Sequence, residues 1–212
     1  MLLISGWASD HRIFDTLDIR YNYLIPIDFL PATLAADLPV AIKENNIDKI
    51  SMLGWSMGAF IIWEALSGYR DPIGEVFLVS ARSEYSKANN EKIKALLEKN
   101  KKGFLRKFYS DCFSDEDCGS FSSFKNGLMK DYIESMDLER LLDGLGYLSE
   151  HRIRPRRLNG LKVRFIHGVK DVIAPVEEVK ELVRNMPEAR FIPVAGAGHM
   201  PFLARSFREA ML

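Results

Sequence analysis

The chain has 212 residues, 47% of them hydrophobic and 27% charged, and its 29 basic residues balance its 29 acidic residues. This composition predicts a globular chain with one buried core and excludes an intrinsically disordered protein. A formal net charge of zero argues against a general nucleic-acid or membrane-surface binder, which would carry a basic excess.

The sequence gives no sign of export or of a membrane anchor. Its two cysteines, Cys112 and Cys118, are too few for a disulfide framework. The apolar start at residues 1–4 lacks the basic flank and the length of a signal peptide. No apolar run approaches the roughly 18 residues that a membrane-spanning helix needs. We therefore expect a cytoplasmic protein in a reducing compartment.

Short apolar runs that end in turns indicate buried, mostly parallel strands. In chain order they are residues 2–4, 23–27, 49–53, 75–79, 163–166 and 190–194. Helical spacing of apolar residues follows several of these runs, at residues 33–46, 59–69, 176–185 and 200–212. Strands that alternate with helices predict an α/β fold of about six strands.

One long stretch interrupts this alternation after the fourth apolar run. Residues 83–158 contain no strand-like pattern, and their apolar spacing predicts helices at 91–100, 104–113, 121–135 and 138–148. We interpret residues 83–158 as a helical lid inserted into a core made of residues 1–82 and 159–212.

The string GWSMG at residues 54–58 lies between a predicted strand and a predicted helix. A serine nucleophile must be presented on a sharp turn between strand and helix, and small residues two positions before and after it relieve the crowding. Gly54 and Gly58 occupy those positions around Ser56. The alternative is a glycine-containing turn in which Ser56 only caps the helix.

A serine nucleophile needs a base and an acid that orients the base. His199 lies in a glycine-containing loop after the last predicted strand and is the candidate base. The other histidines are assigned to the surface (His11 and His151) or to loop packing (His167). Chain order places the acid between Ser56 and His199, also after a strand.

Asp171, in the sequence GVKD, follows the predicted strand 163–166 and is the candidate acid. Glu84, just after the preceding strand, is the rival acid. A turn or helix-capping role for Asp171 is the structural alternative. For the oxyanion we expect backbone N–H groups from Met57, directly after the serine, and from Trp7, after the first strand. Trp7 could instead be an ordinary core aromatic residue.

Together, GWSMG, GVKD with a following proline, and GAGHMPF resemble the α/β-hydrolase superfamily over essentially the whole chain. Gly6-Trp7, the GW before Ser56 and the HMPF after the base resemble one branch more closely, the pimeloyl-[acyl-carrier-protein] methyl ester esterases of biotin synthesis. Within the insert, residues 103–108 and 141–148 are similar to the helical lid of that branch.

The resemblance implies Ser56 as nucleophile, His199 as base, Asp171 as its orienter, and Trp7 and Met57 at the oxyanion hole. It further implies that Phe108 of the lid contacts the acyl chain and that no metal or organic cofactor takes part. Two departures affect the loop after the first strand and the sheet. Ser5 replaces the usual histidine before the glycine, and two N-terminal strands of many relatives are absent.

The predicted lid carries eight basic residues between Lys87 and Lys107 and a second basic cluster at Arg152, Arg154, Arg156 and Arg157. A basic lid could attract an acidic acyl carrier protein. The alternative is a solvated helix face balanced by the acidic residues Asp111, Asp115, Glu116 and Asp117.

The residues predict a serine carboxylesterase, and the resemblance implies a methyl ester of a carrier-bound acyl chain as its substrate. One alternative keeps the chemistry and changes the substrate, as a general short-chain carboxylesterase or a thioesterase. The other is a catalytically silent binding protein on the same fold. Acyl chain length and oligomeric state are left open.

Overall fold

The structure is a computed structural model, and it describes residues 1–17, 19, 21–27, 29–68, 73–156, 160–204 and 206–211. Its described residues form one parallel sheet in the order β1-β2-β3-β4-β5. The strands are β1 (Leu2–Ile4), β2 (Ile50–Trp55), β3 (Ile73–Val79), β4 (Lys162–Gly168) and β5 (Arg190–Val194).

The central strands are buried on both faces, as their continuous apolar runs predict. Leu53 pairs with Leu3 on one side and with Phe77 on the other, and all three side chains are fully buried. Because every pair is parallel, the carboxyl ends of all five strands meet at one edge of the sheet. Loops at that edge can bring together residues that lie far apart in the sequence.

The strand predicted at residues 23–27 is wrong in extent. Only Leu24 pairs with the sheet, through a single bridge to Leu2 supported by the bond from Leu3 N–H to Leu24 O (3.0 Å). Pro26 follows two residues later and has no N–H with which to continue a ladder. The sheet of the described residues therefore has five strands instead of six.

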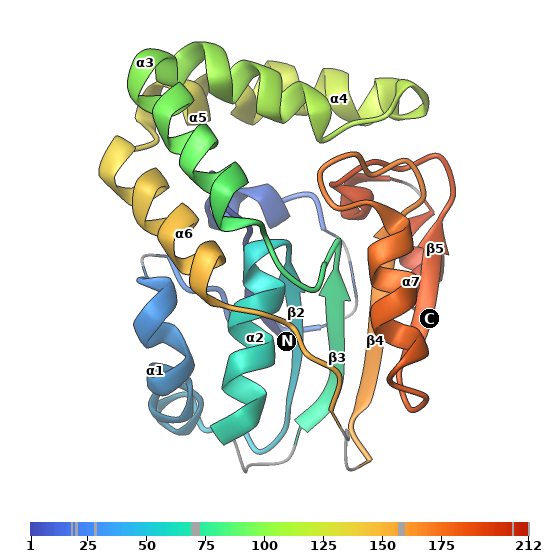
Figure 1. Cartoon of the computed structure of the whole chain (residues 1–212). Coiled ribbons are helices and arrows are strands. Elements are labelled where there is room, and N and C mark those ends of the chain that lie inside the picture. Colours follow the sequence, from blue (N-terminus) through green and yellow to red (C-terminus); the bar gives the residue numbers. More distant parts are fainter. Residues whose placement is uncertain are drawn as a thin grey trace.

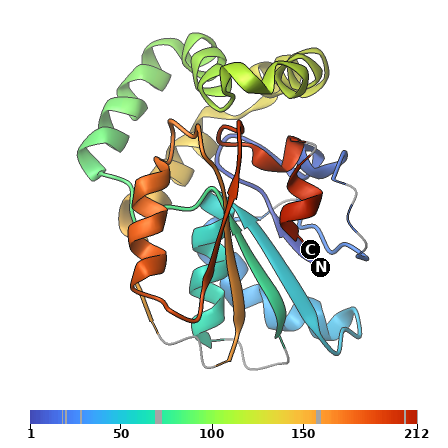
Figure 2. The ribbon, with the colours of Figure 1, turned by 90° about the vertical axis from the view of Figure 1, so that its right-hand side faces the viewer.

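Helices cover both faces of the sheet. α1 (Pro31–Glu44) packs on α2 (Met57–Gly68), and α2 packs on β2. Figure 2 shows α7 (Val176–Arg184) on one side of the sheet and the C-terminal α8 (Phe207–Met211) on the other. The long C-terminal helix predicted over residues 200–212 is instead a short 3-10 turn, η4 (Pro201–Leu203), followed by α8, and Leu212 lies outside the described residues.

The described residues between β3 and β4 contain helices and no strand, as their pattern predicts. They include α3 (Lys87–Asp111), η2 (Asp115–Asp117), α4 (Cys118–Phe124), a π-helical turn (Lys125–Met129), α5 (Lys130–Ser135) and α6 (Leu138–Glu150). The break predicted after residue 100 appears as a kink in α3 at Asn100, which leaves helical geometry (φ −159°, ψ 78°).

Figure 1 shows α3, α4 and α5 lying across the carboxyl edge of the sheet, with α6 running down beside α2. The insert therefore covers the edge where the loops of the sheet converge. Among the described helices, none combines the length and the apolar character that crossing a bilayer requires.

Candidate active site

Ser56 occupies a sharp turn between β2, which ends at Trp55, and α2, which begins at Met57. Its φ of 54° lies in the left-handed region that non-glycine residues rarely adopt, so the turn holds the serine in a strained conformation. Main-chain atoms pack so closely against the positions two residues before and after Ser56 that only glycine, which has no Cβ, fits there. A Cβ on Gly54 would lie 2.4 Å from Gly58 O, and one on Gly58 would lie 2.2 Å from Ile4 O.

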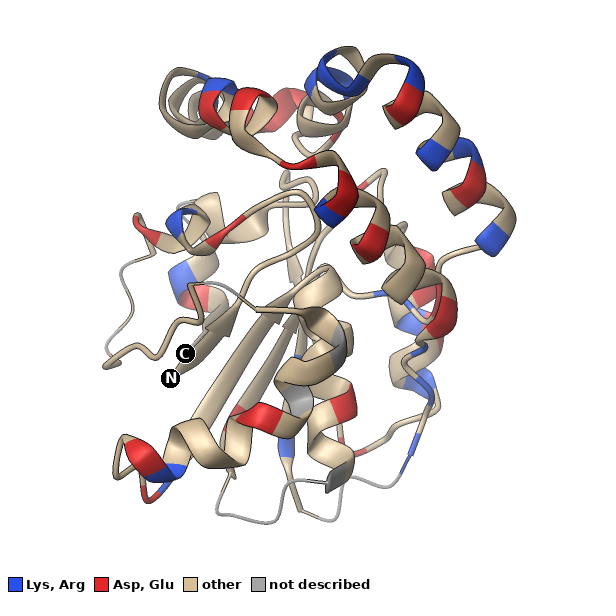
Figure 3. Cartoon of the chain, turned by 90° about the vertical axis from the view of Figure 1, so that its left-hand side faces the viewer, with Lys and Arg blue, Asp and Glu red and all other residues tan. Residues whose placement is uncertain are grey.

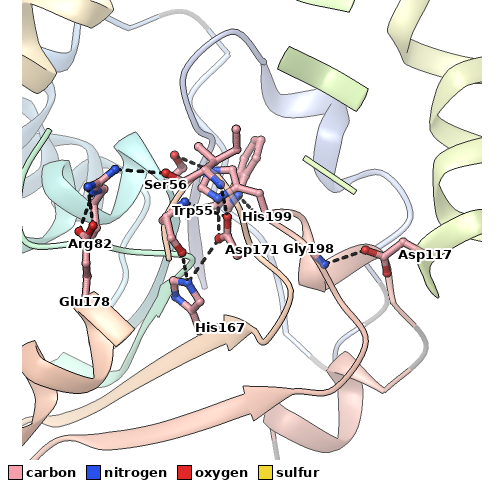
Figure 4. A network of polar contacts seen from close by, with 11 residues as sticks. Trp55, Ser56, Arg82, Asp117, His167, Asp171, Glu178, Gly198 and His199 are labelled. Carbon is pink, nitrogen blue, oxygen red and sulfur yellow. Dashed lines mark hydrogen bonds and ion pairs between the residues drawn. The ribbon is translucent and has the colours of Figure 1, made fainter. Parts of the chain in front are cut away.

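His199 and Asp171 meet the serine at the carboxyl edge of the sheet. His199 Nε2 lies 2.9 Å from Ser56 Oγ, and His199 Nδ1 lies 2.7 Å from Asp171 Oδ2 (Figure 4). When the carboxylate accepts the Nδ1–H, Nε2 is left as the acceptor for the serine hydroxyl. All three side chains are buried, with exposed fractions of 5% or less.

The Asp171 carboxylate is held by its own loop. Its Oδ1 accepts the backbone N–H groups of Ile173 (2.9 Å) and Ala174 (2.8 Å), which leaves Oδ2 directed at His199. Arg82 supports the same loop by donating to Ile173 O (3.1 Å) while it forms a paired contact with Glu178 (2.7 and 2.9 Å). The turn-forming role considered for Asp171 is therefore present together with its contact to the histidine.

His167 is a second imidazole against the acid. Its Nε2 lies 2.7 Å from Ala174 O and 3.3 Å from Asp171 Oδ2, and its side chain is fully buried. Burial lowers the pKa of His167, an effect that Asp171 and the Ala174 carbonyl oppose. The neutral ring therefore donates its Nε2–H to the carbonyl. The sequence predicted the packing of His167 but not its contact with Asp171.

Trp7 follows β1 and lies beside the serine turn. A Cβ on the preceding Gly6 would come within 3.1 Å of Ser56 Cβ. The Trp7 indole donates to Leu141 O of α6 (2.8 Å) and packs edge-on against Phe108 of α3, with ring centroids 5.0 Å apart. The structure thus brings Trp7, Phe108 and Met57 to the same end of the sheet as Ser56.

A crevice opens beside this group, and its walls come from both the sheet and the insert. It is lined on one side by Trp7 and Met57 and on the other by Leu141 and Gly144 of α6. A Cβ on Gly144 would lie 2.6 Å from Trp7 Cδ1, so α6 packs directly on the indole. The crevice borders Met57, the residue after the serine, and Ser56 itself is buried.

Tyr85 was missed by sequence reasoning. Its ring packs against Phe60 of α2 (5.7 Å between centroids) and under the Arg82 guanidinium (4.8 Å). Burial raises the pKa of Tyr85 to about 12, and a hydrogen bond with Ser56 partly opposes that rise. The phenol is therefore neutral near pH 7. A tyrosine six residues after the end of a strand carries no local pattern that would have placed it beside the serine.

The rival acid Glu84 and the histidine His151 contact other residues than the serine. Glu84 is exposed and pairs with Arg152 (2.8 Å), so it does not take the place of Asp171. His151 stacks on Tyr147 at the end of α6, with ring centroids 3.8 Å apart. Within the described ranges, no cluster of three or more histidine, cysteine or acidic side chains is arranged to hold a metal ion.

A protein-family model described as "alpha/beta hydrolase fold" matches residues 26–131, half of the chain. No curated protein matches the sequence. Solved structures resemble it over nearly its whole length. One is an esterase from Exiguobacterium antarcticum, with a TM-score of 0.83 and 17% identity, covering 99% of this chain and 88% of that one.

Two further structures are similar. A thermophilic esterase from Thermogutta terrifontis has a TM-score of 0.80 and 19% identity, covering 99% of this chain and 86% of that one. A bromoperoxidase from Bacillus anthracis has a TM-score of 0.79 and 19% identity, covering 99% and 89%. Esterases and a bromoperoxidase share this fold at such low identity that the likeness establishes the fold alone.

Proposed function

Because the chain belongs to the α/β-hydrolase fold family, we propose that it is a serine carboxylesterase with Ser56, His199 and Asp171 as its catalytic triad. The observation that carries the proposal is the relay of two short contacts, 2.9 Å from Ser56 Oγ to His199 Nε2 and 2.7 Å from His199 Nδ1 to Asp171 Oδ2. A catalytically silent binding protein would have no need for this strained and buried arrangement.

The reaction follows from these contacts. Ser56 Oγ attacks the ester carbonyl carbon while its proton passes to His199 Nε2. The negative charge on the carbonyl oxygen is stabilised by the backbone N–H groups of Met57 and Trp7. Collapse of this intermediate expels the alcohol, which takes the proton from His199 and leaves an acyl-serine. Water then attacks the acyl-serine, with His199 again as base, and releases the acid and the free serine.

The first test is covalent labelling by a fluorophosphonate together with hydrolysis of p-nitrophenyl acetate. The proposal expects stoichiometric labelling of the wild-type protein and none of the Ser56→Ala variant. Ser123→Ala, an exposed serine on α4, is the matched control and should label like the wild type. Equal labelling of Ser56→Ala would overturn the assignment of the nucleophile.

The finer proposal concerns the substrate, a methyl ester of a carrier-bound acyl chain such as the pimeloyl-[acyl-carrier-protein] methyl ester. It is supported by the motif resemblance of the sequence and by the position of Phe108 beside Trp7, where an acyl chain would contact both rings. The rival substrates are free short-chain esters and thioesters. Mass spectrometry of the carrier-bound methyl ester, before and after incubation, separates them by loss of the methyl group.

Docking of an acidic carrier protein would depend on how many basic residues of the insert are not already paired with acidic neighbours. Several pair with acidic neighbours: Lys94 with Glu91, Lys102 with Glu134, and Lys107 with Asp111. Figure 3 shows Lys and Arg positions interspersed with Asp and Glu positions along these helices. Arg156 lies over the Trp63 ring (4.2 Å), and Arg157 lies outside the described residues.

The positive potential of α3 is therefore partly neutralised, and a docking role would fall to exposed cations such as Lys92 and Lys99. Replacing both with glutamate should raise KM for the carrier-bound ester at low salt and leave KM for p-nitrophenyl acetate unchanged. Unchanged KM for both substrates would exclude docking through this helix.

A further inference from the structure

The loop that carries His199 is fastened to the insert as well as to the sheet. Trp55 of β2 donates its indole N–H to His199 O (2.7 Å). From the insert, Cys112 O accepts the backbone N–H of His199 (2.7 Å). The Asp117 carboxylate accepts the backbone N–H of Gly198 (2.7 Å), as Figure 4 shows. The N–H and the carbonyl of His199 and the N–H of Gly198 are therefore all hydrogen-bonded.

Asp117 is itself fixed in place. Its side chain is buried, and the same Oδ2 atom that accepts Gly198 N–H also accepts Ser114 N–H (3.1 Å). Ser114 in turn donates its hydroxyl to Gly196 O. The carboxylate thus joins the start of η2 to the histidine loop through two charge-assisted bonds, the stronger class of hydrogen bond.

The loop that carries His199 and the end of α3 are in direct contact. A Cβ on Gly198 would lie 2.6 Å from Cys112 O and 3.0 Å from Phe113 Cα, both main-chain atoms of the insert. The Gly198 backbone therefore lies directly against the end of α3. A shift of the insert at this point would therefore displace Gly198 and, with it, His199, the residue that follows Gly198.

We propose that Asp117, a residue of the helical insert, is a positioning residue for His199, an inference that rests on the proposed esterase function. By holding Gly198 N–H, it fixes the imidazole at the distance from Ser56 Oγ that proton transfer requires. Without it the Gly198 N–H loses its acceptor, and the residue before His199 is no longer held by the insert. A displacement of about 1 Å at a catalytic group can cost on the order of 100-fold in rate. The insert is then part of the catalytic apparatus as well as a cover over it.

The test compares Asp117→Ala, Asp117→Asn and Asp115→Ala. Asparagine keeps an oxygen that can accept both N–H groups, whereas alanine removes the acceptor. Asp115 lies two residues away in η2, is exposed, and serves as the matched control. We expect Asp117→Ala to lose about 10- to 100-fold in kcat per fluorophosphonate-titrated site, with KM near the wild-type value. Asp117→Asn should recover most of the loss, and Asp115→Ala should match the wild type.

A second readout does not depend on turnover. The proton between His199 Nδ1 and Asp171 Oδ2 (2.7 Å) should give a far-downfield proton NMR signal in the wild type, which should weaken or shift in Asp117→Ala and persist in Asp117→Asn. Thermal unfolding identifies a variant that has merely lost its fold. Wild-type kcat and an unchanged downfield signal in folded Asp117→Ala would overturn the inference. A wild-type protein that neither labels nor hydrolyses esters would instead overturn the proposed function, and the NMR comparison would still decide the role of Asp117.

Discussion

Gly58 is the position where a single methyl group should disturb the serine turn most. It is the second residue of α2, directly beneath β1. A Cβ there would lie 2.2 Å from Ile4 O and 2.8 Å from both Ile4 C and Ser5 O. All three are main-chain atoms, and Ile4 is paired with Gly54 in the sheet and fully buried. Neither partner can rotate away as a flexible side chain would.

The size of the effect follows from this overlap. Real Cβ atoms essentially never approach other heavy atoms closer than 3.0 Å, so β1 and α2 must separate by about 0.8 Å, the difference from 2.2 Å. Overpacking of this kind costs about 1–3 kcal/mol, and the rigid main chain on both sides favours the upper end. The greater helix propensity of alanine returns about 1 kcal/mol. We expect Gly58→Ala to lower the free energy of unfolding by about 2 kcal/mol.

The matched control is Gly146→Ala on α6, where a Cβ would meet nothing within 4 Å. Because only helix propensity changes at this position, the free energy of unfolding of this variant should rise by about 0.5–1 kcal/mol. Urea unfolding measures the free energy of unfolding of both variants. Hydrolysis of p-nitrophenyl acetate measures kcat, which should fall if Ser56 is displaced. Gly58→Ala should lose about 100-fold in kcat because the shift occurs two residues from Ser56, the proposed nucleophile. Equal unfolding midpoints for the two variants would refute the argument from close approach.

Three further outcomes are expected. Asp171→Asn should lower kcat by roughly 10⁴-fold in steady-state hydrolysis, because the amide no longer fixes the protonated Nδ1 tautomer of His199. The folded-state pKa of His167 is lowered, so the unfolded chain binds the extra proton first, and the free energy of unfolding should fall as pH drops below about 6.5. In urea unfolding across that range, His167→Gln should show a shallower decline. Trp7→Phe removes the bond to Leu141 O, should cost about 1 kcal/mol, and should speed hydrogen exchange in α6.

The fold was predictable where buried strands appear in the sequence as continuous runs of apolar residues. β1 and β5 have the predicted bounds, residues 2–4 and 190–194, and β2, β3 and β4 differ from prediction by one or two residues at their ends. A parallel strand covered on both faces needs continuous apolar residues, which a sequence displays directly. Residues 23–27 show the limit of this signal. Their apolar run is real, but Pro26 and a single bridge at Leu24 leave no ladder.

The contacts of the candidate triad were predictable because they depend on chain order and on turns. Ser56 lies in a strand-turn-helix motif, and the acid and base each follow a later strand whose end must lie at the same sheet edge. Topology alone then brings His199 next to Ser56 across 143 residues. His167 and Tyr85 lack such a signal, because their contacts arise from how two loops pack over that edge.

Asp117 shows most clearly what the sequence could not supply. Residues 115–117 read Asp-Glu-Asp, and sequence reasoning treated them as one acidic group balancing a basic helix face. The structure separates them, since Asp115 and Glu116 are exposed while Asp117 is buried against Gly198, 81 residues away. Counting charges assigns the same role to all three. Only the fold of the insert back onto the histidine loop decides which carboxylate meets a backbone N–H and which meets water. For this reason the net charge of the insert says little about a docking partner, while one buried member of its acidic group holds the loop of the proposed catalytic base.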